Sequence, residues 1–485
     1  MKALAKRMMS RTTPTTTSLP RNILATPVVI PRDRHSISRK QIPEHALKVL
    51  YRLHNEGFDA YLVGGCVRDM LLGITPKDFD VATNAKPEQV RNLFRNCRLV
   101  GRRFRLAHIV FGREVIEVAT FRGHHTDEAD EHHDDKKSKR NDHGMLVRDN
   151  VYGSIDEDAQ RRDFTVNALY YNIADFSIVD FANGVRDIEA GVLRMIGDPV
   201  ERYREDPVRM LRAVRFATKL NMRLDDSVSK PLKECAPLLQ NIPPARLFDE
   251  VLKLFAAGKG VANFEMLSDY QLFQQLFPLL KSYLNAPEQP PYQMIHKTFA
   301  DTDTRIRNDQ RITPAYLFAA LLWWPLQARM EQLQQEGGFS PIDAMNLAAA
   351  DVIGRQVQRI AIPKRFTIPA REIWQLQQRM ERAKGKRLQS ILGHPRCRAA
   401  FDFLLLRAAT APAAERAQLQ QQAEYWNKLQ PQMIPQRDHD SDSDADGDRT
   451  SPAPRGPQPA RADGEPKRRG RRGGRRRRKP SAAGE

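Results

Sequence analysis

YLVGGCVRDMLLGITPKDFDVAT, residues 61–83, is the stretch that decides the fold of this chain. The apolar run Ala60–Val63 predicts a strand, a glycine pair breaks it, and Val67–Leu72 has the apolar spacing of a helix. Asp78 and Asp80 follow on a second predicted strand, where side chains two residues apart point to the same face. Two carboxylates so close together repel each other unless a cation lies between them or one of them is protonated.

The glycine turn offers the complementary charge. Gly64 and Gly65 let a ligand approach the backbone closely, the start of the following helix attracts anions, and Arg68 adds a cation. A phosphate-binding turn beside a divalent-metal site is the arrangement that phosphoryl and nucleotidyl transfer require.

The run GGCVRDMLLG followed by KDFD resembles the head-domain motif of class II template-independent nucleotidyltransferases. This family, in the DNA polymerase β superfamily, contains the bacterial poly(A) polymerases and the tRNA CCA-adding enzymes. The resemblance implies two Mg²⁺ ions held by Asp78 and Asp80, with Mn²⁺ as the alternative metal, and ATP as the substrate. It also implies that the triphosphate is held by Gly64, Gly65 and Arg68.

A second motif, RRDFT followed by Val166 and Asn167, begins at Arg161. The family carries a third carboxylate near the first two, and the resemblance implies that it is Asp163. Arg162 would then contact the nucleotide phosphates. Glu117 is the alternative third carboxylate, because its predicted strand, residues 115–121, can bring it to the same face of the sheet.

A helix with two distinct faces is predicted after residue 205. Asp206 is a favourable N-cap and Pro207 a favourable first helical residue. One face is apolar, and the opposite face carries Arg209, Arg212 and Arg215.

The residues Glu205–Arg209, E-D-x-x-R, resemble the family's neck-helix motif. The resemblance implies that Asp206, Arg209 and Arg212 set the incoming base. A carboxylate accepts from the adenine amino group, and a guanidinium donates to ring nitrogens.

GRRFRLAH, residues 101–108, resembles the segment that distinguishes bacterial poly(A) polymerases from CCA-adding enzymes. It favours an enzyme that adds AMP from ATP to RNA 3′ ends without a template, releases pyrophosphate and promotes RNA decay. A CCA-adding enzyme is the alternative, since it shares nearly every residue named above. A non-catalytic RNA-binding scaffold is disfavoured because both carboxylates and both glycines are present. Contacts to RNA are expected from Arg102, Arg103 and Arg105.

The net charge and the composition limit the classes of binding partner. The 485 residues carry a formal net charge of +19, which favours nucleic acid or another anionic partner. No apolar run reaches the length of a membrane helix, and we expect a cytoplasmic enzyme. The expected partners are RNA 3′ ends of mRNA, small RNA or tRNA-like molecules, and RNA-degradation proteins; the oligomeric state stays open.

The predicted fold class is α+β, with more than one core because of the length. The head is expected to hold a small mixed sheet with flanking helices, a surface loop at residues 124–143 and a turn and hairpin at residues 180–193. The predicted regions are a disordered basic leader (1–40), the catalytic head (41–196), a helical neck that binds nucleotide and RNA (197–285), a helical RNA-binding body (286–430) and a disordered acidic then Arg-rich tail (431–485). The tail contributes the predicted RNA contacts Arg475, Arg476, Arg477 and Arg478.

Overall fold

The computed structural model describes residues 23, 24, 26–101, 105–123, 138–140, 146–149 and 151–432. All of them belong to one compact unit, Met1–Gln436. The predictions for the first 22 residues, for Arg102 and Arg103, and for the tail residues 475–478 lie outside the described residues. No described helix has both the length and the apolar character needed to cross a bilayer.

An eight-stranded mixed sheet forms the first part of the chain and confirms the predicted α+β head. Its strands are β1 (Val28–Ile30), β2 (Ala60–Val63), β3 (Asp80–Thr83), β4 (Cys97–Val100), β5 (Leu106–Phe111), β6 (Glu114–Thr120), β9 (Leu169–Asn172) and β10 (Ile178–Asp180). The strand order is β1-β10-β9-β2-β3-β6-β5-β4. Neighbouring strands are antiparallel except β3 and β6, which run parallel and set the register of the site.

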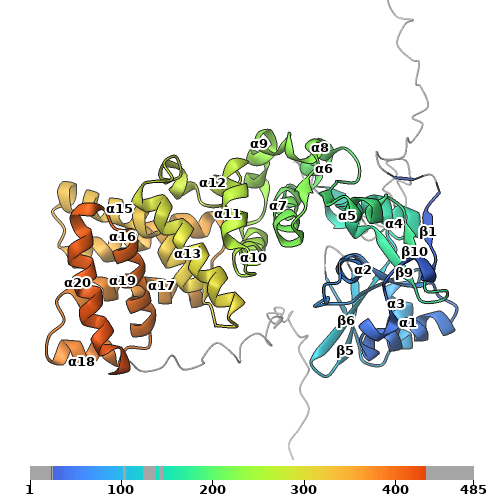
Figure 1. Cartoon of the computed structure of the whole chain (residues 1–485), viewed down its shortest axis with the longest axis horizontal. Helices are drawn as coiled ribbons and strands as arrows, with labels where there is room; N and C mark the ends of the chain where they lie inside the picture. Colours follow the sequence, from blue (N-terminus) through green and yellow to red (C-terminus); the bar gives the residue numbers. More distant parts are fainter. Residues whose placement is uncertain are drawn as a thin grey trace, which may run out of the picture. The chain divides into compact units, whose positions relative to one another are not determined.

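Helices cover the sheet. They are α1 (Glu44–Asn55), α2 (Gly65–Leu71), α3 (Pro87–Leu93), α4 (Ile155–Arg161) and α5 (Gly184–Glu189), with 3-10 turns at Arg32–Arg34, Arg39–Gln41 and Thr165–Asn167. Leu50 of α1 and Val90 of α3 enter the same apolar core as Leu62 and Val81 of the central strands, and Figure 1 shows both helices beside the sheet. A smaller core that contains Tyr170 covers the opposite face.

Three predictions for the head were wrong in detail. The leader does not stay disordered to residue 40, because β1 pairs with β10 at the sheet edge. Residues 180–193 contain a helix, since the Asp180 carboxylate accepts from the backbone N–H groups of Gly184 and Val185, each at 3.0 Å, and starts α5. The insertion contains an antiparallel ribbon, β7 (Ser138–Arg140) with β8 (Leu146–Asp149).

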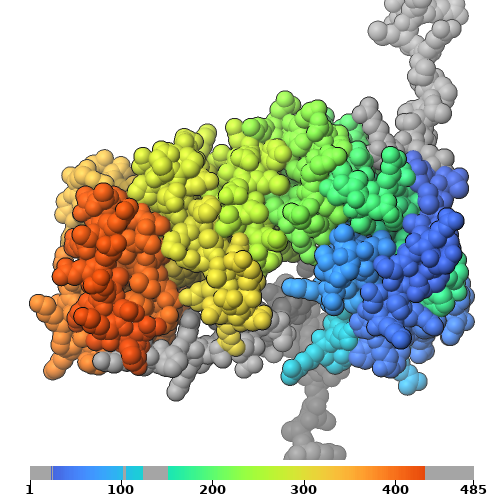
Figure 2. All heavy atoms as spheres, viewed as in Figure 1, coloured from blue at the N-terminus to red at the C-terminus, as the bar shows by residue number. Residues whose placement is uncertain are grey.

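The rest of the described chain is helical, as predicted, apart from the short parallel pair β11 (Val192–Leu193) and β12 (Arg223–Leu224). The first group of helices is α6 (Pro199–Glu205), α7 (Val208–Leu220), α8 (Asp226–Ser229), α9 (Leu232–Cys235), α10 (Pro244–Phe255), α11 (Gly260–Asp269) and α12 (Phe273–Leu276). The second is α13 (Pro290–Arg307), α14 (Pro314–Leu321), α15 (Trp323–Gly337), α16 (Pro341–Arg359), α17 (Lys364–Glu381), α18 (Lys386–Leu392), α19 (Cys397–Thr410) and α20 (Ala413–Leu429). The 3-10 turns are Ala236–Asn241, Pro278–Tyr283 and Gln430–Gln432. Figure 2 shows side chains filling the spaces between the ribbons of these helices.

One apolar core crosses the boundary predicted at residue 196. Phe164, Val166 and Met195 pack in the same cluster as α7 and α10, which contribute Leu211 and Leu247. The RRDFT segment of the head and the first helices of the neck therefore share one buried core. This shared core fixes α7 against the part of the head that carries the RRDFT motif.

Candidate active site

The glycine turn lies between β2 and α2. Gly64 has a φ of +75°, a conformation that favours glycine, and its N–H donates to the Leu169 carbonyl at 3.1 Å. A Cβ on Gly64 would lie 3.2 Å from Arg162 Nη1, and one on Gly65 would lie 3.5 Å from Arg68 Nη2. Each glycine therefore borders one guanidinium group, which is the arrangement that an anion at this turn requires.

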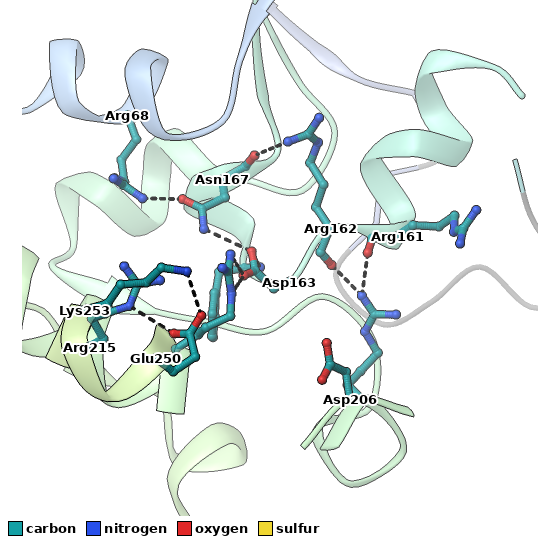
Figure 3. A network of polar contacts seen from close by, with 12 residues as sticks. Arg68, Arg161, Arg162, Asp163, Asn167, Asp206, Arg215, Glu250 and Lys253 are labelled. Carbon is teal, nitrogen blue, oxygen red and sulfur yellow. Dashed lines mark hydrogen bonds and ion pairs between the residues drawn. The ribbon is translucent and has the colours of Figure 1, made fainter. Parts of the chain in front are cut away.

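Arg68 is held inside the protein, with 2% of its surface exposed. Its Nε and Nη2 donate to Asp69 Oδ1 at 2.8 and 2.6 Å, and its Nη1 donates to Asn167 Oδ1 at 2.5 Å. Asn167 in turn donates from Nδ2 to Asp163 Oδ1 at 3.0 Å, and Figure 3 shows this chain of contacts. Arg68 thus contributes charge beside Gly65 while its side chain braces the RRDFT segment.

Arg162 is oriented by two residues that the sequence did not single out. Its Nε donates to the Tyr170 hydroxyl at 2.8 Å and its Nη2 to Asp158 Oδ2 at 2.9 Å. The Tyr170 hydroxyl donates to the same Asp158 oxygen at 2.7 Å. Burial would lower the pKa of Arg162, but Tyr170 and Asp158 raise it above its ordinary value. Arg162 therefore stays charged beside Gly64.

Asp78, Asp80 and Glu117, the two predicted metal-binding carboxylates and the alternative third carboxylate, do not all lie on strands. Asp80 begins β3, whereas Asp78 lies in the preceding loop, so the prediction of one strand for both was wrong. Glu117 on β6 is the register partner of Asp80 in the parallel pair. His108 on β5 approaches it, with Nε2 3.3 Å from Glu117 Oε2.

The Asp80 carboxyl is short of positive charge. Desolvation by surrounding protein raises its pKa to about 6, and Glu117 and Asp78 add to the rise although Arg162 opposes it. No group of three or more His, Cys, Asp or Glu side chains forms a complete metal site within the described ranges. Mg²⁺ in phosphoryl-transfer sites is held by one or two carboxylates plus substrate phosphates. The Asp80 carboxylate, with the negative charges of Glu117 and Asp78 nearby, fits such an ion.

Asp163 lies in a different environment. Its Oδ2 accepts from Nε and Nη2 of Arg212 at 2.7 and 2.5 Å, and its Oδ1 accepts from the Phe164 N–H at 2.9 Å. Burial would raise its pKa, but Arg212 and the hydrogen bonds hold that pKa well below its ordinary value. The structure therefore joins Asp163 to helix α7, where Figure 3 shows it among arginine side chains.

The predicted base-setting residues have partners that the sequence did not reveal. Asp206 accepts from Arg246 through both oxygens, at 2.8 and 2.6 Å. Arg209 Nη1 donates to Glu205 Oε2 at 2.7 Å. We call Glu205, Asp206, Arg209 and Arg246 the base-reading group, after the role predicted for Asp206 and Arg209. Asp206 ends α6, and Pro207 is the N-cap of α7, so the predicted N-cap was one residue too early.

Two further arginines tie the neck together. Arg202 donates from Nη2 to the carbonyls of Arg161 and Arg162 at 2.8 and 2.6 Å. Burial and the nearby Arg209 lower the pKa of Arg202 to about 10. Arg215, which the helical wheel placed on the arginine face, lies 3.7 Å from Glu250 Oε2. The arginine face of α7 is therefore an internal contact surface.

Arg105 is the one arginine of the 101–108 segment whose neighbourhood the structure describes. Its Nη1 lies 2.9 Å from Glu88 Oε1 on α3, and both side chains are about half exposed. This contact joins Arg105 to α3.

Three family models match the sequence. Residues 60–194 match the poly A polymerase head domain, residues 221–284 match the probable RNA and SrmB-binding site of polymerase A, and residues 337–479 match the polymerase A arginine-rich C-terminus. The head-domain match contains the glycine turn, the carboxylates Asp78, Asp80 and Glu117, and the RRDFT motif.

Whole proteins and solved structures agree with these matches. Poly(A) polymerase I of Escherichia coli O6:H1 is 55% identical over 403 residues, which are 83% of this chain and 85% of that protein. Poly(A) polymerase I of Haemophilus influenzae is 50% identical over 404 residues, or 83% and 88% of the two chains. The solved apo form II of a CCA-adding enzyme has a TM-score of 0.55 at 19% identity, covering 81% of this chain and 85% of that one, which shows a shared fold.

Proposed function

Because the chain belongs to the bacterial poly(A) polymerase I family, and so adds AMP from ATP to RNA 3′ ends without a template, we propose how its residues divide this reaction. The reaction joins the RNA 3′ oxygen to the α-phosphorus of ATP and releases pyrophosphate. The family uses a nucleotide and a divalent metal and binds RNA. The observation that carries the assignment is the parallel register of Asp80 and Glu117 beside the glycine turn.

Asp78 and Asp80 hold the metal in this proposal, and Glu117 is the third carboxylate. The contacts favour Glu117 over Asp163, because Glu117 is the register partner of Asp80 whereas both oxygens of Asp163 are engaged by the neck and its own segment. The divalent ions, two Mg²⁺ with Mn²⁺ as a substitute, supply a lower pKa at the RNA 3′-OH and neutralise the leaving pyrophosphate. Asp163 instead fixes Arg212, and through it α7, against the head.

The triphosphate lies at the glycine turn in this proposal. Gly64 and Gly65 present their backbone, Arg162 faces the phosphates beside Gly64, and Arg68 contributes its charge beside Gly65. The Arg68 and Arg162 guanidinium groups are already held by protein partners, so they need little reorganisation when the triphosphate binds. Their part in catalysis is to position the α-phosphorus and to stabilise developing negative charge.

The adenine base is set by Arg209, Asp206 and Arg212. Arg209 donates toward the ring nitrogens, and its direction is fixed by Glu205. Asp206 is held by two hydrogen bonds from Arg246, so its carboxylate cannot rotate freely to suit another base. A base-reading group that is paired before the nucleotide binds supports selection of one base shape.

RNA is bound along the arginine-rich segments in this proposal, by Arg102, Arg103 and Arg105 near the head and by Arg475, Arg476, Arg477 and Arg478 in the tail. The RNA substrates are 3′ ends of mRNA, small RNA and tRNA-like molecules. A cytoplasmic location and contacts with RNA-degradation proteins complete the proposal. The match of residues 221–284 to a probable RNA and SrmB-binding site supports a protein partner in the neck.

A pair of conservative variants tests the third carboxylate. We expect Glu117→Gln to lower single-nucleotide addition about 10- to 100-fold at saturating ATP and Mg²⁺, with an unchanged melting temperature. Asp163→Asn should lower the melting temperature by several degrees, because it leaves Arg212 without its charged partner. Rapid-quench addition of one AMP and calorimetric melting of both variants provide the comparison. Loss of chemistry in Asp163→Asn at an unchanged melting temperature, with an active Glu117→Gln, would reverse the assignment.

A further inference from the structure

We propose that Asp158 and Tyr170 are positioning residues for ATP: together they clamp the Arg162 guanidinium so that Nη1 faces the phosphate-binding turn. This inference rests on the proposed triphosphate role of Arg162. It adds two residues that touch neither substrate nor metal and that act through Arg162.

The clamp is a closed triangle of buried polar groups. Asp158 is 8% exposed and Tyr170 is fully buried. The hydroxyl of Tyr170 accepts from Arg162 Nε and donates to Asp158 Oδ2, while Arg162 Nη2 donates to that same oxygen. Bonds to Nε and Nη2 fix the plane of a guanidinium, because its atoms form a rigid fork.

The remaining nitrogen is the one that meets the turn. Arg162 Nη1 lies 3.2 Å from the position of a Cβ on Gly64, and its hydrogen bond to the Asn167 carbonyl is long, at 3.5 Å. A guanidinium Nη carries two hydrogens, so Nη1 can donate to a phosphate oxygen without breaking either bond of the clamp. The clamp therefore directs one donor toward the ligand and reserves the others for the protein.

Both clamp residues are anchored to the strands that form the site. Tyr170 belongs to β9, which pairs with β2 immediately before the glycine turn. Asp158 Oδ1 also accepts from the Arg122 N–H at 3.2 Å, just beyond the end of β6, the strand that carries Glu117. Contacts with β9 and with the residue Arg122 after β6 therefore fix the position of the Arg162 guanidinium. β9 pairs with the strand that leads into the glycine turn, and β6 carries Glu117.

The charges of the clamp are stable at neutral pH. Burial raises the pKa of Tyr170 well above its ordinary value, so the hydroxyl keeps its proton and can donate to Asp158. Burial would also raise the pKa of Asp158, but Arg162 and the Tyr170 hydroxyl bring it below its ordinary value. A neutral phenol between an anion and a cation serves as a spacer that sets orientation.

Two adjacent tyrosines of β9 give a matched test. Tyr170→Phe removes the hydroxyl of the clamp, whereas Tyr171→Phe removes a buried hydroxyl that has no hydrogen-bond partner among the described residues. We expect Tyr170→Phe to raise the KM for ATP about 5- to 10-fold, with kcat within about twofold and an unchanged KM for RNA. The Kd of a non-hydrolysable ATP analogue, measured by calorimetry, should rise by the same factor, and Tyr171→Phe should leave both constants unchanged.

The Arg162→Ala background separates positioning from a general effect on the fold. There the added effect of Tyr170→Phe on analogue affinity should vanish, because the clamp has nothing left to orient. Equal effects of Tyr170→Phe and Tyr171→Phe, or an effect that persists without the Arg162 side chain, would overturn the clamp. Unchanged analogue affinity in Arg162→Ala alone would instead overturn the triphosphate role on which the clamp depends.

Discussion

The carboxylates of this enzyme lie in two regions with opposite electrostatic environments. Among the described residues, Asp78 and Asp80 have no salt-bridge partner, and the pKa of Asp80 is raised by its surroundings. In the neck, Asp206 is bound by Arg246 and Glu205 by Arg209, at distances below 3 Å. The first region has unbalanced negative charge, and the second is neutralised within the protein.

This difference indicates which ligand each region is prepared to bind. Unbalanced carboxylates are stabilised by a divalent cation and its bound phosphates, so the catalytic region is completed by its ligands. The base-reading group has its hydrogen bonds in place beforehand, so under the proposed assignment an incoming base has to fit donors whose direction is already fixed. The proposed assignment therefore places catalysis and base choice on separate sets of residues, and mutations should separate them.

The largest effect should come from the unbalanced region. We expect Asp80→Ala to lower AMP addition roughly a thousandfold or more while RNA affinity stays unchanged, because the metal loses a ligand and the neck is untouched. Single-turnover addition and filter binding of the same RNA measure the two properties. The control is Asp33→Ala, which removes an exposed carboxylate outside the site. Near-full activity in Asp80→Ala would show that the metal does not need this carboxylate, and would contradict the proposed difference between the two regions.

A smaller effect should appear in base choice. Arg209→Ala should reduce the preference for ATP over CTP roughly 10- to 100-fold, the value of one well-placed hydrogen-bonding pair, with a lesser change in the affinity for triphosphate. Competition between ATP and CTP for one labelled RNA measures the ratio. Arg204→Ala, on the exposed side of α6, is the matched control. An unaltered ratio would show that Arg209 belongs to the scaffold alone.

The smallest effect concerns stability without metal. The pKa of Asp80 rises from its ordinary value of 3.8 to about 6 on folding, so the folded state binds the proton more tightly. Ionisation of Asp80 therefore lowers the free energy of unfolding. This loss of stability is absent below pH 4, grows as the pH rises toward 6 and is constant above it. Surrounding protein removes part of the water from the Asp80 carboxyl, but the residue as a whole is exposed, so solvent screening limits this loss of stability to less than about 1 kcal/mol.

The neutral variant Asp80→Asn should consequently melt about 1–2 °C above the wild type at pH 7.5 in EDTA, and at the same temperature at pH 4. Added Mg²⁺ should stabilise the wild type more than the variant and reverse the order. A variant that melts lower in EDTA at pH 7.5 would show that the Asp80 charge is balanced within the protein.

Local patterns in the sequence predicted the elements that position the site. The apolar run before Gly64 is β2, and the alternation around Glu117 is β6, because side-chain period follows directly from strand geometry. The strand β4 was not predicted, since Cys97–Val100 is short and only partly buried. The helix α5 was read as a turn because its start is fixed by the Asp180 side chain rather than by apolar spacing.

The partners of the site residues were not predictable in the same way. Asp206 and Arg246 are 40 residues apart, and Asp163 and Arg212 are 49 apart, so each pair depends on how helices pack and not on local spacing. Asp158 lies three residues before the RRDFT motif, but only its contact with Arg162 distinguishes it from a solvated carboxylate. Long-range pairing is also what makes the arginine face of α7 an internal contact surface.

The core shared by Phe164, Val166 and Met195 with α7 and α10 also bears on biosynthesis. At ribosomal rates of roughly 5–20 residues per second, the end of α10 is synthesised several seconds after Met195. During that interval the apolar side chains of the head lack their partners, and the head cannot complete its packing. We expect the nascent enzyme to acquire its catalytic face and its base-selecting helix in one cooperative step, so that a head folded without its selector does not accumulate.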